Sequence, residues 1–440
     1  MSKTDVLIVG AGLAGLCCAR KLQKEGLSYQ IVEASDAVGG RIRTDREDGF
    51  LLDRGFQVLQ TAYPEALAEL DYEALELHPF VCGALVRHNG HFHRLTDPWR
   101  KNGAFFPNLM SPALRLGDKY RMWKLRRDAL QRSIEDIFAR PETSSRVALT
   151  QRGFSRRAIE RFFKPFLGGI TLDSSLGVSS RMLEFAFKMF SEGDAALPAK
   201  GMQAIPEQLA STLDEGSIQF HQKVTSLLTG RLTTADGAVL EADSIVVATE
   251  GPEASRLLGF SKMVPSRSVC CLYFVAKEPP VTEPILVLSG SSRGPINNLV
   301  VSNLVAPTYA PAGDFLVSVT VLGMPSRDDQ SVVTQVRSQL KRWYGLVAEE
   351  WPLLRIYRIE HALPVVASME PYRTMRISPG IYVCGDHRAT PSIQGAMESG
   401  RLTAEALIRD LRGEPDPVKL FDDHPRARGL ELARKGEGDD

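Results

Sequence analysis

The sequence lacks the features that would assign it to several specialised classes of protein. Its six cysteines include no C-x-x-C pair, and four of them stand as two adjacent pairs, which suits neither a disulfide framework nor a zinc site. No stretch approaches the roughly twenty apolar residues needed to span a bilayer. No basic segment followed by a long apolar run marks a signal peptide. We therefore expect a cytoplasmic protein whose thiols are buried and reduced.

An excess of charge of one sign is also missing. The chain has 53 basic and 53 acidic residues, so its formal net charge is zero and it has no overall field that would attract nucleic acid. The hydrophobic fraction of 43% and the charged fraction of 24% are those of a globular protein. With 440 residues, the chain is long enough for two domains.

Basic residues are nevertheless concentrated locally, between Arg115 and Arg161. One interpretation is peripheral contact with anionic lipid headgroups, which would give access to a substrate dissolved in the membrane. The other is a solvated helix face, which is the more common origin of such a cluster. We favour the second interpretation from the sequence alone.

The first forty residues carry the clearest motif. A short β-branched run, residues 6–9, leads into a G-x-G-x-x-G turn at residues 10–15. A helical stretch follows, and then a second strand that ends at Glu33. Gly10 permits a tight turn, Gly12 lets the backbone approach a pyrophosphate, and Gly15 lets helix and strand pack closely. Glu33 stands where a carboxylate can accept hydrogen bonds from a ribose, so the motif predicts a dinucleotide site.

Three further segments carry a resemblance to a known family. Glu33 is followed by Gly39-Gly40-Arg41, Asp53 begins a D-x-G element, and a late strand ends in Gly385-Asp386 before a G-A-x-x-S-G helix. Together these resemble the amine-oxidase superfamily, which includes monoamine oxidases, protoporphyrinogen oxidases and phytoene desaturases. The resemblance implies FAD as the cofactor. It also implies that Arg41 pairs with the pyrophosphate or braces the flavin, as the forked donors of a guanidinium allow.

The resemblance implies a set of cofactor-binding residues. The D-x-G element would border the isoalloxazine, a central valine would contact adenine through its backbone, and the last helix would begin near the flavin ring. The predicted cofactor residues are Gly10, Ala11, Gly12, Leu13, Ala14, Gly15, Glu33, Ala34, Gly39, Gly40, Arg41, Gly55, Phe56, Gln57, Val224, Gly385, Asp386, Ile393 and Ala396.

The positions of these motifs predict an α/β protein with two domains. A discontinuous Rossmann-like FAD-binding domain, of the architecture of p-hydroxybenzoate hydroxylase and monoamine oxidase, would comprise residues 1–75, 197–264 and 355–415. A mixed α+β substrate-binding domain would comprise residues 76–196 and 265–354, with a C-terminal tail at 416–440. Helical spacing predicts helices in residues 110–195 and 328–344, and apolar runs predict strands in residues 266–322.

Two departures from the amine-oxidase pattern bear on the substrate. Amine oxidases of this superfamily place a lysine on a strand that matches residues 268–274, but Cys271 stands near that position. Ser392-Ile393-Gln394 replaces their amine-binding aromatic residue. The Gly385-Asp386 pair and the residues that follow it instead resemble the corresponding segment of phytoene desaturases and hydroxysqualene dehydroxylases. This resemblance implies oxidation or desaturation of an apolar, isoprenoid- or tetrapyrrole-like small molecule, with hydride transfer to flavin N5 and reoxidation by O2 or a quinone.

Catalytic residues beyond the flavin cannot be read from the sequence. His387 and His361 are candidates by position alone, with a structural role as the alternative. His91 and His93 share a strand face, but no cysteine or carboxylate cluster accompanies them, so we predict no metal site. Two alternative functions stay open: an amine oxidase that uses no lysine, and a non-catalytic binding protein, because GDP-dissociation inhibitors share the fold.

Overall fold

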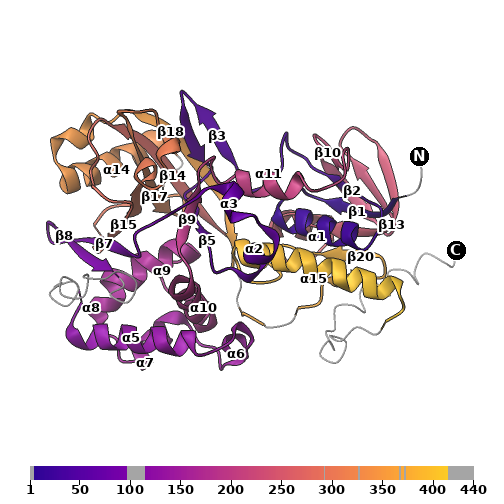
Figure 1. Cartoon of the computed structure of the whole chain (residues 1–440), viewed down its shortest axis with the longest axis horizontal. Coiled ribbons are helices and arrows are strands. Elements are labelled where there is room, and N and C mark those ends of the chain that lie inside the picture. The colour runs from indigo at the N-terminus through magenta and orange to yellow at the C-terminus, as the bar shows by residue number, and fades with distance from the viewer. Residues whose placement is uncertain are drawn as a thin grey trace. The chain divides into compact units, whose positions relative to one another are not determined.

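A computed structural model describes residues 4–96, 114–291, 293–325, 328–365, 368–370 and 373–414 (Figure 1). The chain packs into two compact units that interleave along the sequence. The first unit comprises residues 1–40, 208–264 and 370–440, and the second comprises residues 41–207 and 265–369. None of the described helices is both long enough and apolar enough to cross a bilayer.

The first unit is built on a parallel sheet that contains strands from all three of its segments. Strands β10, β2, β1, β13 and β20 lie side by side and run parallel, and β19 adds an antiparallel edge. Antiparallel β12 and β11 extend the sheet from the first half of β13. The strands are β1 (Thr4–Val9), β2 (Tyr29–Val32), β10 (Ile218–Gln219), β11 (Val224–Leu228), β12 (Arg231–Thr234), β13 (Val239–Val247), β19 (Arg376–Ser378) and β20 (Ile381–Val383).

Two helices of this unit, α15 (Ile393–Leu411) and α1 (Leu13–Lys24), pack closely against each other through a glycine. In Figure 1, α15 runs beside α1, and the third helix is α12 (Gly251–Leu257). A Cβ atom added at Gly400 of α15 would lie 2.1 Å from the carbonyl oxygen of Ala14, so only glycine allows this approach. The central strands are apolar on both faces, as expected for a covered parallel sheet: Leu7 and Ile8, which point to opposite faces, are both buried.

The second unit contains a seven-stranded, mostly antiparallel sheet in the order β18-β14-β17-β16-β15-β7-β8. Only β15 and β7 are paired in parallel. The strands are β7 (Gly83–His88), β8 (His91–Thr96), β14 (Ser266–Ala276), β15 (Leu286–Ser289), β16 (Ile296–Val301), β17 (Phe315–Leu322) and β18 (Leu353–Pro364). Asn89 and Gly90, with φ of 49° and 80°, form the two-residue turn between β7 and β8 that an Asn-Gly pair favours.

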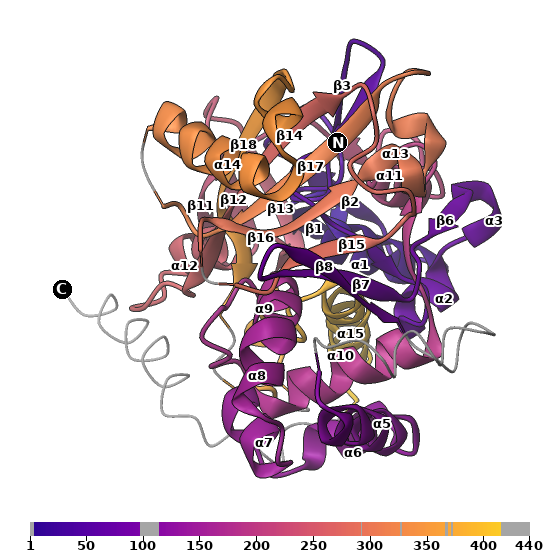
Figure 2. The same cartoon turned by 90° about the vertical axis from the view of Figure 1, so that its left-hand side faces the viewer.

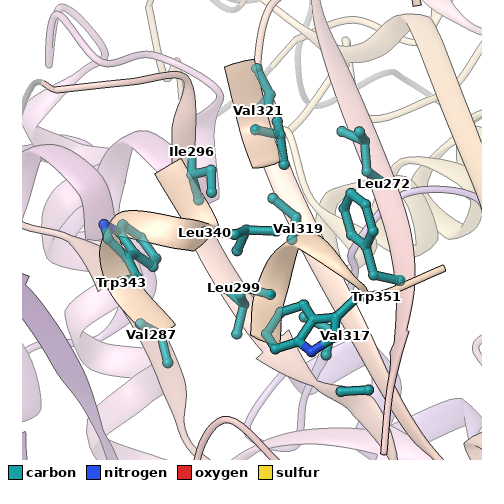
Figure 3. Close-up of a cluster of buried hydrophobic side chains, with 14 of the residues drawn as sticks. Leu272, Val287, Ile296, Leu299, Val317, Val319, Val321, Leu340, Trp343 and Trp351 are labelled. Carbon is teal, nitrogen blue, oxygen red and sulfur yellow. The ribbon is translucent and has the colours of Figure 1, made fainter. Parts of the chain in front are cut away.

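One face of this sheet is covered by α14 (Asp329–Tyr344). Alternate residues of β14 and β17, such as Leu272 and Val319, point to Leu340 and Trp343 of the helix, and all four are buried (Figure 3). Trp351, which follows the short 3₁₀ helix η3 (Leu346–Glu349), closes the cluster. The alternation of strand residues leaves Cys271, Tyr273 and their neighbours on the opposite face of the sheet.

The second unit also contains a group of helices (Figure 2). They are α5 (Leu116–Leu130), α6 (Ile134–Ala139), α7 (Ser145–Gln151), α8 (Arg156–Ala158), α9 (Lys164–Thr171) and α10 (Ser180–Glu192). A π-helix, η1 (Ile159–Phe163), joins α8 to α9. The Asn297 side-chain amide of β16 donates a hydrogen bond to the carbonyl of Pro165 in α9 at 3.0 Å, which links the helices to the seven-stranded sheet. Their apolar residues, including Leu125 and Phe163, form a common core.

Smaller elements complete the second unit. Strands β3 (Thr44–Glu47) and β4 (Phe50–Asp53) form a hairpin, and β5 (Leu59–Gln60), β9 (Ala195–Pro198) and β6 (Leu77–Pro79) form a three-stranded sheet. The remaining short helices are α2 (Pro64–Glu69), α3 (Tyr72–Leu75), α13 (Ser302–Val305) and η2 (Pro307–Tyr309). Helix α11 (Ala204–Ala210) spans the boundary between the two units.

The predicted helical and strand regions are confirmed in large part, although α13 and η2 interrupt the predicted strand region 266–322. Residues 116–192 are largely helical, α14 occupies residues 329–344, and β14 and β17 lie in the predicted strand region; residues 97–113 lie outside the described part. The compact units differ from the predicted domains, because residues 41–75, 197–207 and 355–369 pack within the second unit. Asp45, for example, accepts a hydrogen bond from Tyr357 of β18 at 2.7 Å. The assignment of functions to these units stays a prediction.

Candidate functional site

The predicted dinucleotide-binding segments of the first unit meet at one edge of its parallel sheet. Val9 of β1, Val247 of β13 and Val383 of β20 are register partners. Because the three strands run parallel, the residues that follow them emerge at the same edge. Gly10 and Gly385 therefore stand at that edge with one strand between them, although 375 residues separate them in sequence. The carboxyl edge of such a sheet is where α/β proteins bind ligands.

The glycine turn after β1 is shaped by close backbone contacts. Gly10 has φ of 107°, which L side chains rarely adopt, and a Cβ atom there would lie 3.0 Å from the Ala248 carbonyl. A Cβ atom at Gly15 would lie only 2.0 Å from the Gly10 carbonyl oxygen. At Gly12, by contrast, no described heavy atom lies within 4 Å of an added Cβ atom. The turn is therefore tightly packed on the protein side and open beside Gly12.

Helix α1 begins directly at this open space. Gly12 is its N-cap and offers no side chain to bind the first backbone N–H groups, and the first turn contains no acidic residue. Leu13 and Ala14 thus present N–H groups at the positive end of a 12-residue helix. This arrangement suits the phosphates of a dinucleotide, so the residues present fit the predicted cofactor.

Glu33 fixes the turn from the neighbouring strand. Its carboxylate is buried and accepts a hydrogen bond from the Ala11 N–H at 2.7 Å. The N–H and hydroxyl of Ser35 donate to the other oxygen at 2.8 and 2.7 Å. A carboxylate offers about four acceptor positions, so one is left for a ribose hydroxyl. Glu33 therefore supports the phosphate turn as well as the predicted ribose contact; Ala34 beside it is exposed.

The Gly39-Gly40 pair contacts the glycine turn that follows β1. The N–H of Gly39 donates to the Ala11 carbonyl at 2.9 Å, and a Cβ atom on Gly40 would lie 3.5 Å from the Cα of Gly12. Both glycines have positive φ, 114° and 58°. The second glycine motif thus borders the space beside Gly12, which is consistent with its predicted place along the pyrophosphate.

The late Gly-Asp pair is held by helix α15. Gly385 has φ of 138°, and its N–H donates to the Ser399 hydroxyl at 2.9 Å. Asp386 is buried. Helix α15 is capped by Ser392, whose hydroxyl accepts from the Gly395 N–H at 3.1 Å. Ile393 and Ala396 at the helix start are partly exposed, as required of residues that contact a ligand.

The structure identifies three residues of this edge that the sequence prediction omitted. Thr249 follows β13, and a Cβ atom on Gly10 would lie 3.6 Å from its methyl group, while one on Gly385 would lie 3.4 Å from its carbonyl oxygen. Thr249 therefore stands between the two glycine segments. Ser399 and Gly400 orient α15, as described above. The G-A-x-x-S-G pattern contained the last two, but nothing in the sequence pointed to Thr249.

Val224 lies in the edge hairpin of the first unit. It is buried at the start of β11, and its carbonyl accepts a hydrogen bond from the Arg256 guanidinium at 3.1 Å. A contact of this valine backbone with adenine stays a prediction.

The remaining predicted cofactor residues belong to the second unit and are linked to one another. The Gln57 side chain donates to the Arg41 carbonyl at 2.9 Å, and the Arg41 guanidinium donates to the Ala362 carbonyl at 2.9 Å. Gly55 has φ of 92°, and a Cβ atom there would lie 2.7 Å from the Ile359 side chain. Phe56 is partly exposed.

A buried carboxylate anchors the D-x-G element within the second unit. Asp53 accepts hydrogen bonds from the Thr44 hydroxyl, the Met202 N–H and the Tyr309 hydroxyl at 2.6, 3.0 and 2.8 Å. The Tyr273 hydroxyl donates to its backbone carbonyl at 2.8 Å. Burial nevertheless raises the pKa of Asp53 to about 6, because desolvation outweighs these three hydrogen bonds. The cluster fixes the strand that leads into Gly55.

The two histidine candidates occupy different units. His361 of β18 is partly exposed, and its Nδ1 lies 2.6 Å from the Ser266 hydroxyl. His387 is buried, and its carbonyl accepts from the Arg373 guanidinium at 3.0 Å. The rings of His91 and His93 lie 6.4 Å apart, and within the described residues no three histidine, cysteine or acidic side chains are grouped to hold a metal.

Comparisons with known proteins give a family match. Residues 13–408 match the family described as "Flavin containing amine oxidoreductase". Protoporphyrinogen oxidase 2 of Arabidopsis thaliana is 25% identical over 273 residues, which are 52% of this chain and 51% of that protein. Coproporphyrinogen III oxidase of Bacillus subtilis is 24% identical over 299 residues, 58% of this chain and 62% of that protein. The chain thus spans less than two thirds of the length of either relative.

A solved structure shows the same fold. An oxidoreductase from Methanosarcina mazei superimposes with a TM-score of 0.71 at 18% identity, covering 92% of this chain and 100% of that one. The predicted fold class, a Rossmann-like unit combined with a mixed α+β unit, is therefore confirmed.

The open space beside Gly12 gives a first prediction. Gly12→Ala adds a methyl group where the protein has room, so the unfolding midpoint of the cofactor-free protein should stay unchanged. The methyl group would keep a pyrophosphate from the backbone, and FAD affinity should fall at least about tenfold, about 1.4 kcal/mol. Flavin fluorescence titration of the cofactor-free protein measures this. Gly15→Ala is the contrasting variant, since its methyl clash should lower the unfolding midpoint itself. Unchanged FAD affinity in Gly12→Ala would place the pyrophosphate elsewhere.

Asp53 gives a second prediction, on stability. Its pKa is raised from 3.8 to about 6 in the folded protein, so the folded state holds the proton more tightly than the unfolded state. The stabilisation is complete below pH 4 and is lost as pH rises through about 6. Relative to Asp53→Asn, the unfolding free energy of the unaltered protein should fall by about 2–3 kcal/mol from pH 4 to pH 7. Urea titrations measure the difference, and a pH-independent difference would contradict the account.

Proposed function

Because the chain belongs to the flavin-containing amine oxidoreductase family, we propose that it oxidises or desaturates an apolar, isoprenoid- or tetrapyrrole-like substrate. The family match confirms FAD as the cofactor and oxidoreductase as the class of enzyme. Bound FAD supplies the hydride acceptor, while the protein binds and orients the substrate and excludes water. We propose O2 or a quinone as the final electron acceptor.

A cluster of partly exposed phenylalanines in the second unit carries the proposal for the substrate class. Phe162 and Phe166, one helical turn apart on η1 and α9, have stacked rings with centroids 5.2 Å apart. Phe187 and Phe190 of α10 extend the cluster, with centroids 6.4 and 5.2 Å from that of Phe166. All four side chains are only partly buried. Such a surface suits a conjugated or branched apolar molecule, whose area gives most of the binding energy.

The centre of strand β14 argues against a simple amine as substrate. Cys271 is fully buried, and its Sγ lies 3.4 Å from the Ser318 hydroxyl. Burial raises the pKa of this thiol to about 11, so it stays neutral at neutral pH. No lysine occurs in the whole strand, residues 266–276. Strand β14 therefore offers no amine that could act as a base or carry a water-mediated contact to flavin.

His361 is the better of the two candidates for proton transfer. It is partly exposed, and the Ser266 hydroxyl at its Nδ1 orients the ring while leaving Nε2 for another partner. His387 is 4% exposed, which leaves little room for a substrate beside it. We propose that His361 accepts or holds a proton during oxidation.

An anaerobic titration tests the substrate class directly. The oxidised, flavin-loaded protein is mixed without oxygen with protoporphyrinogen IX, coproporphyrinogen III, a linear isoprenoid polyene, or a polyamine, and the loss of oxidised-flavin absorbance is followed. We expect a tetrapyrrole or the polyene to reduce the flavin and the polyamine not to do so.

Other results would favour the alternative functions. Rapid reduction by the polyamine alone would make the chain an amine oxidase without the usual lysine. A purified protein that takes up no FAD would indicate a binding protein that has lost redox function.

The role of His361 gives a kinetic prediction. With the substrate that bleaches the flavin, His361→Gln should slow the reductive half-reaction by about a hundredfold, the usual scale for loss of acid–base catalysis. His387→Gln is the matched comparison and should leave that rate within a fewfold of the unaltered protein. Stopped-flow spectroscopy measures both. An unchanged rate in His361→Gln would remove this histidine from the mechanism.

A further inference from the structure

Helix α5 of the second unit has two faces of different character. Its inner face carries Leu125, which belongs to the common core of the helical group, and Ala129, which is also buried. Its outer face carries Leu116 and Tyr120, which are 66% and 63% exposed. These are among the most exposed large hydrophobic side chains of the described residues, and they are one helical turn apart. An exposed aliphatic and aromatic pair on one helix face is a typical mark of an interaction surface.

The aromatic part of this outer face is ordered by ring contacts. Trp123 lies at i+7 from Leu116, on the same stripe, and its ring stacks on Tyr120 with centroids 5.7 Å apart. The Arg127 guanidinium lies over the Trp123 ring, 4.8 Å from its centroid. The stripe therefore changes along the helix from aliphatic to aromatic to cationic. Tyrosine and tryptophan combine an apolar ring with a polar edge, which suits a boundary between water and lipid.

Helix α5 carries a strong excess of positive charge, although the net charge of the whole chain is zero. Residues 115–127 contain six basic residues and one acid, a local charge of +5. The acid, Asp118, is 1% exposed and accepts from the Ser155 N–H and hydroxyl at 2.8 and 2.6 Å. The next acid along the helix, Asp128, pairs with Arg152 at 3.0 Å. The acids of the helix are thus engaged with the protein, whereas three of its basic side chains, those of Arg115, Lys124 and Arg127, are exposed.

We propose that the outer face of α5 docks on the surface of an anionic lipid bilayer. Leu116, Tyr120 and Trp123 would enter the interfacial layer, and the exposed Arg115, Lys124 and Arg127 would meet the lipid phosphates. Helix α5 lies with α6 and α7 at the end of the helical group away from the seven-stranded sheet, so it can approach a flat surface (Figure 2). A nucleic acid would match the charge of this face, but its phosphate backbone would not provide an apolar environment for the exposed leucine beside the Tyr–Trp stack.

This inference selects between the two interpretations of the basic cluster between Arg115 and Arg161. A solvated helix face explains the charge but not the exposed apolar stripe inside it. The inference is independent of the proposed redox reaction, because α5 contains none of the proposed cofactor residues. It does agree with an apolar substrate, which would be concentrated in a membrane.

Vesicle co-sedimentation of the full-length, flavin-loaded protein tests the docking surface. We expect binding to phosphatidylcholine vesicles that contain phosphatidylglycerol, weak binding to phosphatidylcholine alone, and loss of binding as salt is raised. The double variant Leu116→Glu/Tyr120→Glu should lower the apparent affinity at least about tenfold, since each change places a carboxylate in the apolar stripe. Lys124→Glu/Arg127→Glu should abolish the preference for phosphatidylglycerol.

A matched control uses the other exposed apolar pair of the same unit. Leu346 and Val347 of η3 are 68% and 52% exposed, and Leu346→Glu/Val347→Glu should bind vesicles as the unaltered protein does. Unchanged flavin content and unfolding midpoint show that each variant is folded. Absence of binding to phosphatidylglycerol vesicles at low salt would overturn the proposal, and so would equal binding by Leu116→Glu/Tyr120→Glu. A change from dimer to monomer in that variant, with vesicle binding unaffected, would make α5 a protein interface instead.

Discussion

The candidate cofactor site depends on a close approach of backbone to backbone that only glycine permits. At Gly15 an added methyl group would lie 2.0 Å from the Gly10 carbonyl, and at Gly400 it would lie 2.1 Å from the Ala14 carbonyl. The first contact sets α1 directly against the end of β1, and the second sets α15 directly against α1. Because both helices are so close, the N-terminus of α1 opens at the edge of the sheet where Gly385 also emerges. The anion-binding end of a helix is thereby built from segments far apart in sequence.

Polar side chains then hold the loops that these contacts bring together. Glu33 binds the glycine turn through Ala11, and Ser399 binds the N–H of Gly385. In the second unit Asp53 does the same for the D-x-G element, through three donors from separate segments. The cost of burying that carboxylate is seen in its raised pKa. Buried polar groups of this kind specify one arrangement of loops rather than adding net stability.

The sequence was most informative where local chemistry decides the structure. The glycine turn and the strand that leads to Glu33 each depend on neighbours in the chain, and both could be predicted. The grouping of residues 41–75 with the second unit could not, because it follows from long-range contacts such as the Tyr273–Asp53 hydrogen bond. Thr249 was missed for the same reason, since a threonine after a buried strand has no local signature. The exposed stripe on α5 needed burial to be known before it could be distinguished from a core-facing pattern.

A crystal structure of the FAD complex would show whether this edge of the parallel sheet holds the cofactor. We expect the pyrophosphate within hydrogen-bonding distance of backbone N–H groups at the start of α1, beside Gly12, with the Gly385–Asp386 turn contacting the same cofactor molecule. Density for FAD at another place, or a pyrophosphate that does not approach α1, would contradict this expectation.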